Sequence, residues 1–316
     1  MENMTITMPA IRIKLTGTCN RTCPFCHEEG DMKNIKNVIP NDDFYTCIDQ
    51  IMKKTAIGRI MLTGGEPTIH PEFMSIVSGL SKLSDEISVT TNGIKKISVD
   101  EWSQFKNAGL TKVVVSIHDT SAKDLLSLES IKKNLSWAEN ALENQFNNVK
   151  NIVESGIDSR INIVAYGDFD KTLKSVKTLL NLQKDRALEI RLLNNLVEPF
   201  ESQEVIEDIL KNLGASKING YQRAGSSNVT NRYITSEGKI LSVKIAFPYY
   251  LNSICSNCPV KDKCYEGFYG VRVERIMNEY YVRLCIYKQT TDVLIPWMDF
   301  INSPTVNEIQ KGNVII

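Results

Sequence analysis

Three cysteines near the beginning of the chain, Cys19, Cys23 and Cys26, stand at a C-x3-C-x2-C spacing just after the apolar run Ile11–Leu15. A [4Fe–4S] cluster usually takes four cysteine thiolates. Three thiolates on one tight loop would leave one iron without a protein ligand, and such an iron can bind and activate a small molecule. Zinc held by these cysteines and His27 is the alternative, although structural zinc usually takes C-x2-C pairs from two separate segments. The spacing therefore favours an iron–sulfur site.

A second cysteine group lies near the C-terminus, where Cys255, Cys258 and Cys264 form a C-x2-C-x5-C pattern and Cys285 follows. Four thiols placed in this way predict a second metal site, either an iron–sulfur cluster or a zinc ribbon. The eighth cysteine, Cys47, lies in a helical pattern and is expected to be an ordinary helix residue. Because the chain shows no export signal, the clustered cysteines indicate metal ligands and not a disulfide framework.

The charge of the chain is balanced, since Lys+Arg and Asp+Glu both number 37 in 316 residues. A generic nucleic-acid binder needs a basic surplus to neutralise phosphates, so no nucleic-acid polymer is expected as a partner. A small anion held by a few arginines is compatible with this balance. The sequence has neither an apolar run long enough to span a membrane nor a signal peptide, so we expect a cytoplasmic protein with no membrane partner.

Short apolar runs alternate with helical patterns through the first two thirds of the chain, as in a parallel sheet. The runs are Ile11–Leu15, Arg59–Leu62, Ile87–Thr90, Val113–Ile117, Ile161–Ala165 and Leu188–Leu193. The helical patterns are Asp42–Lys54, Pro71–Leu83, Val99–Asn107, Ser130–Glu154, Phe169–Leu182 and Glu201–Asn212. The alternation predicts an α/β fold, a partial (β/α)6 TIM barrel at residues 1–213. Functional residues should gather at the carboxyl ends of its strands.

A change of composition near Gly214 predicts a small C-terminal unit at residues 214–316. Its first part is typical of a hairpin, with strands at Arg232–Thr235 and Ile240–Phe247 around a Ser-Glu-Gly turn. The second cysteine group follows in the same unit. We therefore expect this unit to be a small auxiliary iron–sulfur domain.

Polar and glycine-rich residues stand where the predicted strands end. The run Gly64–Pro67 follows the second strand, and glycines there either let a backbone approach a ligand closely or form an ordinary turn. Thr91 and Asn92 end the third strand, and Ser116 ends the fourth. His118 follows Ser116 closely and is the candidate acid or base, although the pattern assigns no catalytic residue.

The cysteine triplet, with Phe25 before its third cysteine, and the Gly64–Pro67 run resemble the signature of the radical S-adenosylmethionine (radical SAM) superfamily. The resemblance implies that the open iron binds the amino and carboxylate groups of S-adenosylmethionine (SAM). An electron from a flavodoxin or ferredoxin-type donor would then cleave SAM, and the 5′-deoxyadenosyl radical would remove a hydrogen atom from a substrate. The protein would position these partners and exclude water.

The same resemblance implies roles for particular side chains. The backbone of the glycine run and Glu66 would hold the amino group of SAM, and the strand ends would contact its methionyl and ribose groups. The residues implied to bind SAM are Phe25, Gly64, Gly65, Glu66, Pro67, Thr91, Asn92, Ser116 and Asn162.

The C-x2-C-x5-C group resembles the middle of the motif of SPASM and twitch domains, which carry auxiliary [4Fe–4S] clusters in radical SAM enzymes. The full motif has further cysteines that this chain lacks, one at the position of Phe268 and one after the turn at Gly238. The resemblance therefore implies a single auxiliary cluster. Its ligands would be Cys255, Cys258, Cys264 and Cys285.

Four arginines, Arg12, Arg160, Arg191 and Arg272, resemble basic residues that hold the nucleotide and its triphosphate in the GTP cyclases of molybdenum-cofactor biosynthesis. The guanidinium fork suits phosphate oxygens, although a surface ion pair is the commoner role for each arginine alone, and Arg191 would alternatively hold the SAM carboxylate. The resemblance implies a small phosphorylated nucleoside-like substrate and a lyase or C–C bond-forming reaction. Two departures, a C-terminus without the cyclases' Gly-Gly tail and a different auxiliary cysteine spacing, indicate a related enzyme with another reaction.

Two other functions stay open at this point. A radical SAM maturase would modify a ribosomally made peptide, but such enzymes often carry an N-terminal peptide-binding domain, for which the position of Cys19 leaves no room. A zinc-binding interaction module would use the same cysteines but would not need the Gly64–Pro67 run. The sequence therefore favours a small-molecule substrate, with a peptide as the second choice.

Overall fold

The computed structural model describes residues 4–23, 35–183, 188–268, 270–288 and 290–313. The six predicted strands are present and run parallel, in the spatial order β8, β7, β6, β5, β4, β2. Their bounds are β2 (Ala10–Lys14), β4 (Arg59–Thr63), β5 (Ile87–Thr91), β6 (Leu110–Ser116), β7 (Asp158–Ala165) and β8 (Leu188–Asn194). The predicted α/β fold with a partial barrel is confirmed.

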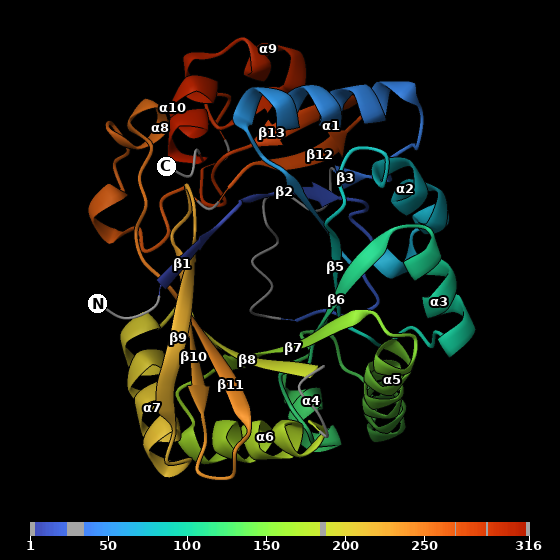
Figure 1. Ribbon diagram of the computed structural model, residues 1–316, viewed down its shortest axis with the longest axis vertical. Helices are drawn as coiled ribbons and strands as arrows, with labels where there is room; N and C mark the ends of the chain where they lie inside the picture. Colours follow the sequence, from blue (N-terminus) through green and yellow to red (C-terminus); the bar gives the residue numbers. More distant parts are fainter. Residues whose placement is uncertain (1–3, 24–34, 184–187, 269, 289, 314–316) are drawn as a thin grey trace.

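Helices α1 to α7 lie outside the ring of strands (Figure 1). They are α1 (Asp42–Thr55), α2 (Phe73–Leu80), α3 (Val99–Asn107), α4 (Ala122–Ser127), α5 (Leu135–Glu154), α6 (Phe169–Asn181) and α7 (Pro199–Asn212). The side chains of Asn41, Ser98 and Asn134 each accept a backbone N–H of the first turn of α1, α3 and α5. Because Asn134 caps α5, this helix begins at Leu135 and not at the predicted Ser130. Helix α4 was not predicted from the sequence.

The apolar core fills the layer between strands and helices. Ile11 and Ile13 of β2 and Ile60 and Leu62 of β4 are fully buried in this layer. The intervening residues of each strand face the inside of the ring, because successive side chains of a strand point to opposite sides. Many inward positions are polar, and two cavities lie inside the ring.

The C-terminal part extends the barrel sheet beyond β8. It adds β11 (Ile240–Ala246), which is parallel to β8, and then β10 (Asn228–Ile234) and β9 (Ser216–Arg223). β1 (Met4–Thr7) pairs with β9 at this edge. The predicted hairpin is thus confirmed as β10 and β11.

The same part also extends the sheet beyond β2. It adds β12 (Arg272–Ile276), which is parallel to β2, and then β13 (Glu279–Arg283) and β14 (Leu294–Pro296), while β3 (Ile35–Lys36) pairs with β12. The short helices α8 (Asn252–Cys255), α9 (Trp297–Ile301) and α10 (Pro304–Asn313) lie beside these strands. Residues 1–213 and 214–316 therefore share one open sheet, and their division into two units stays a prediction.

A buried ion cluster joins the barrel to the added strands. The Glu274 carboxylate of β12 accepts from Lys14 Nζ of β2 at 3.0 Å and from Arg283 Nε of β13 at 2.8 Å. All three side chains are at most 1% exposed. Burying an unpaired charge costs several kcal/mol, so these three side chains must stay paired in the folded protein. Their pairing connects β2, β12 and β13.

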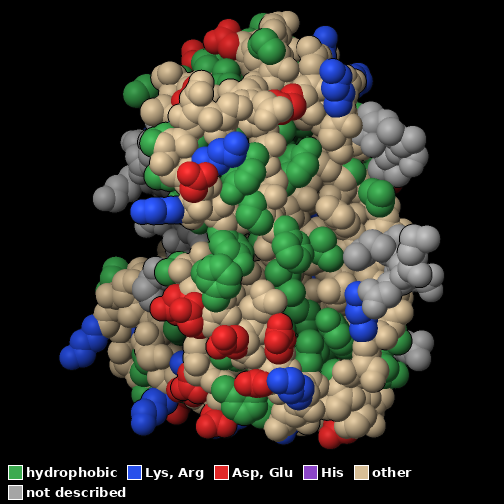
Figure 2. Space-filling model, turned by 90° about the vertical axis from the view of Figure 1, so that its left-hand side faces the viewer, with side chains coloured by type: hydrophobic (Ala, Val, Ile, Leu, Met, Phe, Trp, Pro, Cys, Tyr) green, Lys and Arg blue, Asp and Glu red, His purple; other side chains and the backbone are tan. Residues whose placement is uncertain are grey.

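The face that carries α7 links the barrel to the second cysteine group. Figure 2 shows apolar side chains gathered at the middle of this face, with Asp and Glu side chains below them. Phe200, 68% exposed in α7, packs edge-on against Tyr265 with ring centroids 5.6 Å apart. Tyr265 directly follows Cys264, so this contact ties α7 to the cysteine segment.

None of the helices in the described ranges is both long and apolar enough to cross a membrane.

Candidate active site

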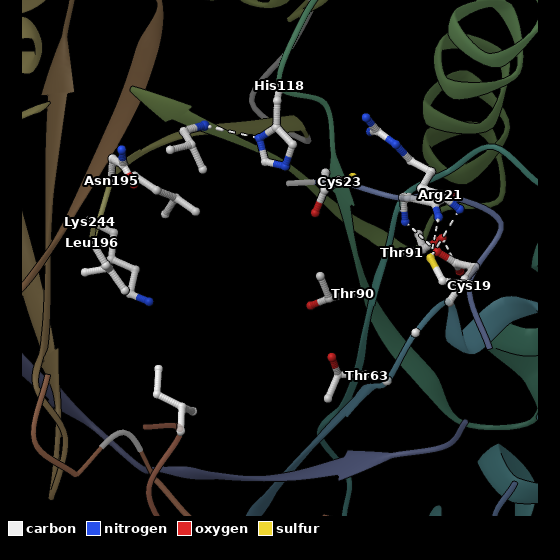
Figure 3. Close-up of a pocket in the computed structure, with 18 of the residues that line it drawn as sticks. Cys19, Arg21, Cys23, Thr63, Thr90, Thr91, His118, Asn195, Leu196 and Lys244 are labelled. Atoms are coloured by element: carbon white, nitrogen blue, oxygen red, sulfur yellow. Dashed lines mark hydrogen bonds between the residues drawn. The ribbon is translucent and has the colours of Figure 1, made fainter. Parts of the chain in front are cut away.

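A cavity of about 300 Å³ opens at the carboxyl ends of the barrel strands. Thr63, Thr91 and Ser116 reach it from the ends of β4, β5 and β6, as expected for this kind of barrel. Figure 3 shows Cys19 and Cys23 on the wall that also carries Thr91. The predicted site residues brought together here are Cys19, Cys23, Gly64, Gly65, Glu66, Thr91, Asn92, Ser116, His118 and Arg272. The predicted Phe25 and Cys26, and the alternative zinc ligand His27, lie outside the described residues.

The two glycines of the Gly64–Pro67 run pack directly against the start of the cysteine loop. The N–H of Gly65 donates to Thr16 O at 2.7 Å, and the N–H of Glu66 donates to Thr18 O at 2.8 Å. A Cβ atom on Gly65 would lie 2.1 Å from Thr18 O, and Gly64 has a φ of +139°. The glycines therefore allow the chain's own loop, directly before Cys19, to pack closely against them. This contact accounts for at least part of the need for glycine at these positions.

The Glu66 carboxylate joins the ends of β4 and β5. It accepts hydrogen bonds from Thr91 Oγ1 at 2.6 Å, from the N–H of Asn92 at 2.7 Å, and from Thr68 through Oγ1 at 2.6 Å and N–H at 3.1 Å. Burial raises the pKa of Glu66, while these hydrogen bonds favour the ionised carboxylate. Glu66 is thus held in one position at the cavity wall. Pro67 begins the 3-10 turn that follows and is buried behind that wall.

Asn92 connects the strand ends to the cysteine loop. Its Nδ2 donates to Asn20 Oδ1 at 2.7 Å and approaches Cys19 Sγ at 3.8 Å. Gln145 Nε2 of α5 donates in turn to Asn92 O at 2.6 Å and to Ser116 O at 3.2 Å. Cys19, β5, β6 and α5 are therefore linked by one hydrogen-bonded chain.

A second anchor of the cysteine loop has no signal in the sequence. Arg21 and Thr22, between Cys19 and Cys23, both bind Glu129, which follows α4. The Glu129 carboxylate accepts from Arg21 Nε at 2.7 Å and from the Thr22 N–H at 2.9 Å and Oγ1 at 3.1 Å. The two charged side chains are 2% and 1% exposed. This arrangement, called the Glu129 clamp below, holds the middle of the cysteine loop against the barrel.

His118 lines the cavity as a neutral ring. The N–H of Val164 donates to His118 Nδ1 at 3.3 Å. Burial, and secondly the nearby Arg21 charge, lower the pKa of His118 to about 3. The ring is therefore neutral at physiological pH, with Nδ1 as acceptor and Nε2 as the site of the proton. It can donate a hydrogen bond from Nε2 but does not carry a second proton for acid catalysis.

The four predicted arginines do not come together. Arg272 of β12 is fully buried and lines the main cavity, and its register partner Arg12 lines a small neighbouring one. Arg160 and Arg191 instead bind Glu189, at 2.6 Å and 3.0 Å, and neither lines the main cavity. Arg191 also contacts the Tyr221 hydroxyl. The substrate and SAM contacts predicted for Arg160 and Arg191 therefore fall outside this cavity, and they stay predictions.

The predicted SAM contact Asn162 is next to the cavity but does not line it. It stands in register with Ser116, and its Oδ1 is buried without a hydrogen-bond partner in the described part of the chain. Its role stays a prediction.

The wall opposite the cysteines contains residues that the sequence analysis missed. Figure 3 shows Asn195, Leu196 and Lys244 facing Cys19 and Cys23 across the cavity. Asn195 follows β8, so the rule for strand ends could have identified it. Lys244 and Glu266 belong to the C-terminal part, whose place beside the cavity depends on long-range pairing that no local pattern shows.

The second cysteine group forms its own small cavity of about 20 Å³. Cys255, Cys258, Cys264 and Cys285 all line it. Backbone N–H groups donate to two of the sulfurs, Gly267 to Cys264 Sγ at 3.2 Å and Lys288 to Cys285 Sγ at 3.4 Å. Hydrogen bonds of this kind are typical of thiolates that ligate iron–sulfur clusters.

The four thiols of this group also affect one another electrostatically. Burial, together with the other three thiols, raises the pKa of Cys255, so these thiols are close enough to influence one another.

Comparisons with known proteins agree with this geometry. Residues 13–182 match the model of the Radical SAM superfamily. A protein named "Probable GTP 3′,8-cyclase" from Saccharolobus solfataricus is 25% identical over 256 residues, which are 78% of this chain and 77% of that protein. One of the same name from Sulfurisphaera tokodaii is 24% identical over 294 residues, 90% of this chain and 82% of that protein.

Solved structures share the fold. Streptococcus suis SuiB bound to S-adenosylmethionine aligns with a TM-score of 0.53 and 15% identity over 98% of this chain, which spans 66% of that one. SuiB bound to the precursor peptide SuiA gives a TM-score of 0.55 and 16% identity, with 98% and 67% covered. At these identities the likeness concerns the fold alone. Because the family model covers more than half of the sequence and the cysteine loop lies at the expected end of the barrel, the chain belongs to the radical SAM superfamily.

Proposed function

We propose that this radical SAM protein removes a hydrogen atom from a small anionic metabolite, with a phosphorylated nucleoside as the first candidate, and so leads to C–C bond formation or rearrangement. The observation that carries the proposal is the main cavity. Cys19 and Cys23 lie on one wall, and Lys244 and Arg272 line the same cavity. The names of the GTP cyclase relatives support a nucleotide as substrate.

The residues at the cysteine wall fit a cluster and SAM. Cys19, Cys23 and Cys26 would hold a [4Fe–4S] cluster, which together with bound SAM supplies a 5′-deoxyadenosyl radical after one-electron reduction. The Glu66 hydrogen bonds and the Glu129 clamp would keep the loop and the strand ends in fixed positions, as efficient positioning of reacting groups requires. Val164, Leu193 and Leu196 line the space between the walls and would exclude water.

Arg21 is the best candidate to bind the SAM carboxylate, in place of the predicted Arg191. It lies in the cysteine loop, lines the cavity and is 6% exposed. Its Nη2 is buried and has no hydrogen-bond partner in the described part of the chain. A buried N–H group without a hydrogen-bond partner raises the free energy of the folded protein unless a ligand accepts its hydrogen bond. A carboxylate is a strong acceptor for a guanidinium group.

The opposite wall would bind the substrate. Lys244 and Arg272 supply positive charge for phosphate, and Asn194, Asn195 and Asn228 supply amide groups for sugar or base. This set differs from the predicted one: it keeps Arg272, adds Lys244 and leaves out Arg12, Arg160 and Arg191, which do not line the cavity.

The change Lys244→Gln should weaken binding of the phosphorylated substrate and spare SAM cleavage. A lost charge-assisted hydrogen bond costs about 1.5–3 kcal/mol, or roughly 10–150-fold in affinity. Arg272→Lys should also weaken binding, because a point charge cannot replace the fork. The measurement is transfer of deuterium from candidate substrates into 5′-deoxyadenosine, with the exposed Lys150→Gln as control. Transfer from an unphosphorylated peptide, and from no phosphorylated metabolite, would favour the peptide maturase instead.

We also propose that Cys255, Cys258, Cys264 and Cys285 hold an auxiliary [4Fe–4S] cluster. With four irons in each cubane, anaerobically reconstituted protein should contain about eight iron atoms per chain. Changing Cys255, Cys258 and Cys264 together to Ala should leave about four and preserve SAM cleavage without substrate. One zinc and four irons in the wild type would show that the second site is a zinc site.

A further inference from the structure

One residue of the cysteine loop, Thr22, does not line the main cavity, although its neighbours Arg21 and Cys23 do. Thr22 instead contacts the segment that joins α4 to α5. The N–H of Ser130 donates to Thr22 O at 2.7 Å, and the N–H of Ile131 donates to Thr22 Oγ1 at 3.2 Å. This segment is therefore bound directly to the part of the loop that lies between two proposed cluster ligands.

The side chains of the segment are exposed to solvent, although its backbone is bound to the loop. Ile131 is 60% exposed, and Leu135, the first residue of α5, is 52% exposed. Lys132 is exposed between them, and Lys133 is half-buried with its Nζ 5.3 Å from the centre of the Trp137 ring. We call Ile131, Lys132, Lys133 and Leu135 the Ile131 patch.

The Ile131 patch is fixed at both of its ends. At one end the Glu129 clamp binds the cysteine loop, and at the other the Asn134 side chain accepts the N–H of Trp137 at 2.8 Å and caps α5. Helices α4 and α5 pack together through a small apolar cluster of their own. The exposed side chains thus belong to a preorganised surface, which lowers the entropy cost of docking another molecule.

The Ile131 patch is positively charged. Its ionisable side chains are Lys132 and Lys133, whereas the neighbouring Glu129 carboxylate is 1% exposed and is bound by Arg21. Two exposed apolar side chains next to two cations form an apolar centre with a charged rim, as docking surfaces often have. The complementary partner is a protein whose own contact surface is acidic.

The proposed chemistry requires an electron from outside the chain. Reductive cleavage of SAM consumes one electron, which must reach the cluster proposed for Cys19, Cys23 and Cys26. Electron transfer through protein slows steeply with distance, so a carrier has to dock close to the cysteine loop. Bound SAM and substrate would occupy the main cavity, and a protein carrier therefore needs a surface on another side of the loop. The Ile131 patch is such a surface, because its backbone contacts Thr22.

We propose that an acidic one-electron carrier protein docks on the Ile131 patch. The carrier loses one electron there, and the cluster gains this electron by way of the contact between Ile131 and Thr22. Interfaces of electron-transfer complexes are small and weak, which agrees with the size of this patch. The inference rests on the proposed function and adds to it the kind of partner and the place where that partner binds.

The second cysteine group provides a matched control surface. Lys263 is exposed there, and Lys261 Nζ lies 5.4 Å from the centre of the Tyr250 ring. This surface therefore also has one exposed lysine and one lysine over an aromatic ring, with Asp262 between them. Val260, which is 47% exposed, corresponds to Ile131. A carrier that delivered its electron through the auxiliary site would bind this surface and not the Ile131 patch.

Calorimetric titration of the full-length, cluster-containing protein with flavodoxin, an acidic flavin protein, tests the docking surface at low ionic strength. The double variant Lys132→Glu with Lys133→Glu should bind at least about tenfold more weakly, since electrostatic attraction changes association rates about 10- to 1,000-fold. Added salt should reduce this difference. The control Lys261→Glu with Lys263→Glu should bind as the wild type does. Absence of binding to the wild type, or equal affinities in both double variants, would overturn the proposal.

The apolar centre of the patch is tested by Ile131→Ser, a change at an exposed position that should not affect folding. It should weaken flavodoxin binding at low and at high salt alike, because an apolar contact is not screened by ions. Val260→Ser is its control and should leave the affinity unchanged. Wild-type affinity in Ile131→Ser would contradict a role of the apolar centre in docking.

Formation of 5′-deoxyadenosine separates this inference from the proposed function. Dithionite is a small reductant that needs no docking surface, so it should support the wild type and the Lys132→Glu, Lys133→Glu variant equally. Flavodoxin kept reduced by its reductase and NADPH should support the wild type at least about tenfold better at low salt. Equal rates with flavodoxin would overturn the docking surface and leave the proposed function intact. Absence of product with dithionite would remove the proposed function, while the titration would still decide whether the carrier binds the Ile131 patch.

Discussion

The Glu129→Ala variant should lose its first cluster and unfold more easily than the wild type. The substitution removes three hydrogen bonds to the cysteine loop and leaves the Arg21 charge buried without its partner. Breaking a buried ion pair by removing one partner costs about 3–5 kcal/mol. Iron content after reconstitution and urea unfolding of the cluster-free protein measure the two effects.

Two further variants separate the clamp from a general loss of charge. Glu139→Ala removes an exposed glutamate from α5 and should behave as the wild type. The double variant Arg21→Ala with Glu129→Ala no longer contains the stranded charge, so it should be more stable than Glu129→Ala alone. Wild-type iron content and stability in Glu129→Ala would show that the clamp does not hold the loop.

The Glu274→Gln variant should be destabilised by a similar amount, about 3–5 kcal/mol for a broken buried ion pair. Lys14 and Arg283 both bind this carboxylate, and all three side chains are buried between β2, β12 and β13. Loss of the charge should therefore loosen the C-terminal strands from the barrel. The same urea unfolding experiment measures the effect.

Glu279→Gln is the matched control, because Glu279 is an exposed residue on the same hairpin. It should change the free energy of unfolding little, as is usual for surface groups. Equal unfolding midpoints for Glu274→Gln and Glu279→Gln would mean that the ion cluster contributes nothing to holding the two parts together.

Local patterns explain why most of the fold could be predicted. Continuous apolar runs bounded by polar residues identify the parallel strands, and α3 has the predicted bounds because Ser98 and Glu101 form a capping box at its start. The main cavity followed from the rule that strand ends carry function, which correctly brought Thr91, Asn92 and Ser116 to one place.

The roles of Arg160 and Arg191 were expected from the resemblance to the GTP cyclases, and they stay predictions. Arg160 is the third residue of β7 and Arg191 the fourth of β8, so neither stands at a carboxyl end. Both arginines pair with Glu189. Glu129 could not be identified from the sequence, because its role depends on a contact with Arg21, which is 108 positions away in the chain. Lys244 could not be identified either, because its place at the cavity depends on the pairing of β11 with β8.

The central claim is that this chain cleaves SAM reductively, and the direct test is anaerobic incubation of the dithionite-reduced, reconstituted protein with SAM. Chromatography should detect 5′-deoxyadenosine from the wild type and none from Cys23→Ala, which lacks a ligand of the first cluster. The auxiliary-site triple variant should still form it. If the wild type, with its full iron content, forms no 5′-deoxyadenosine with or without candidate substrates, the account of its chemistry is wrong.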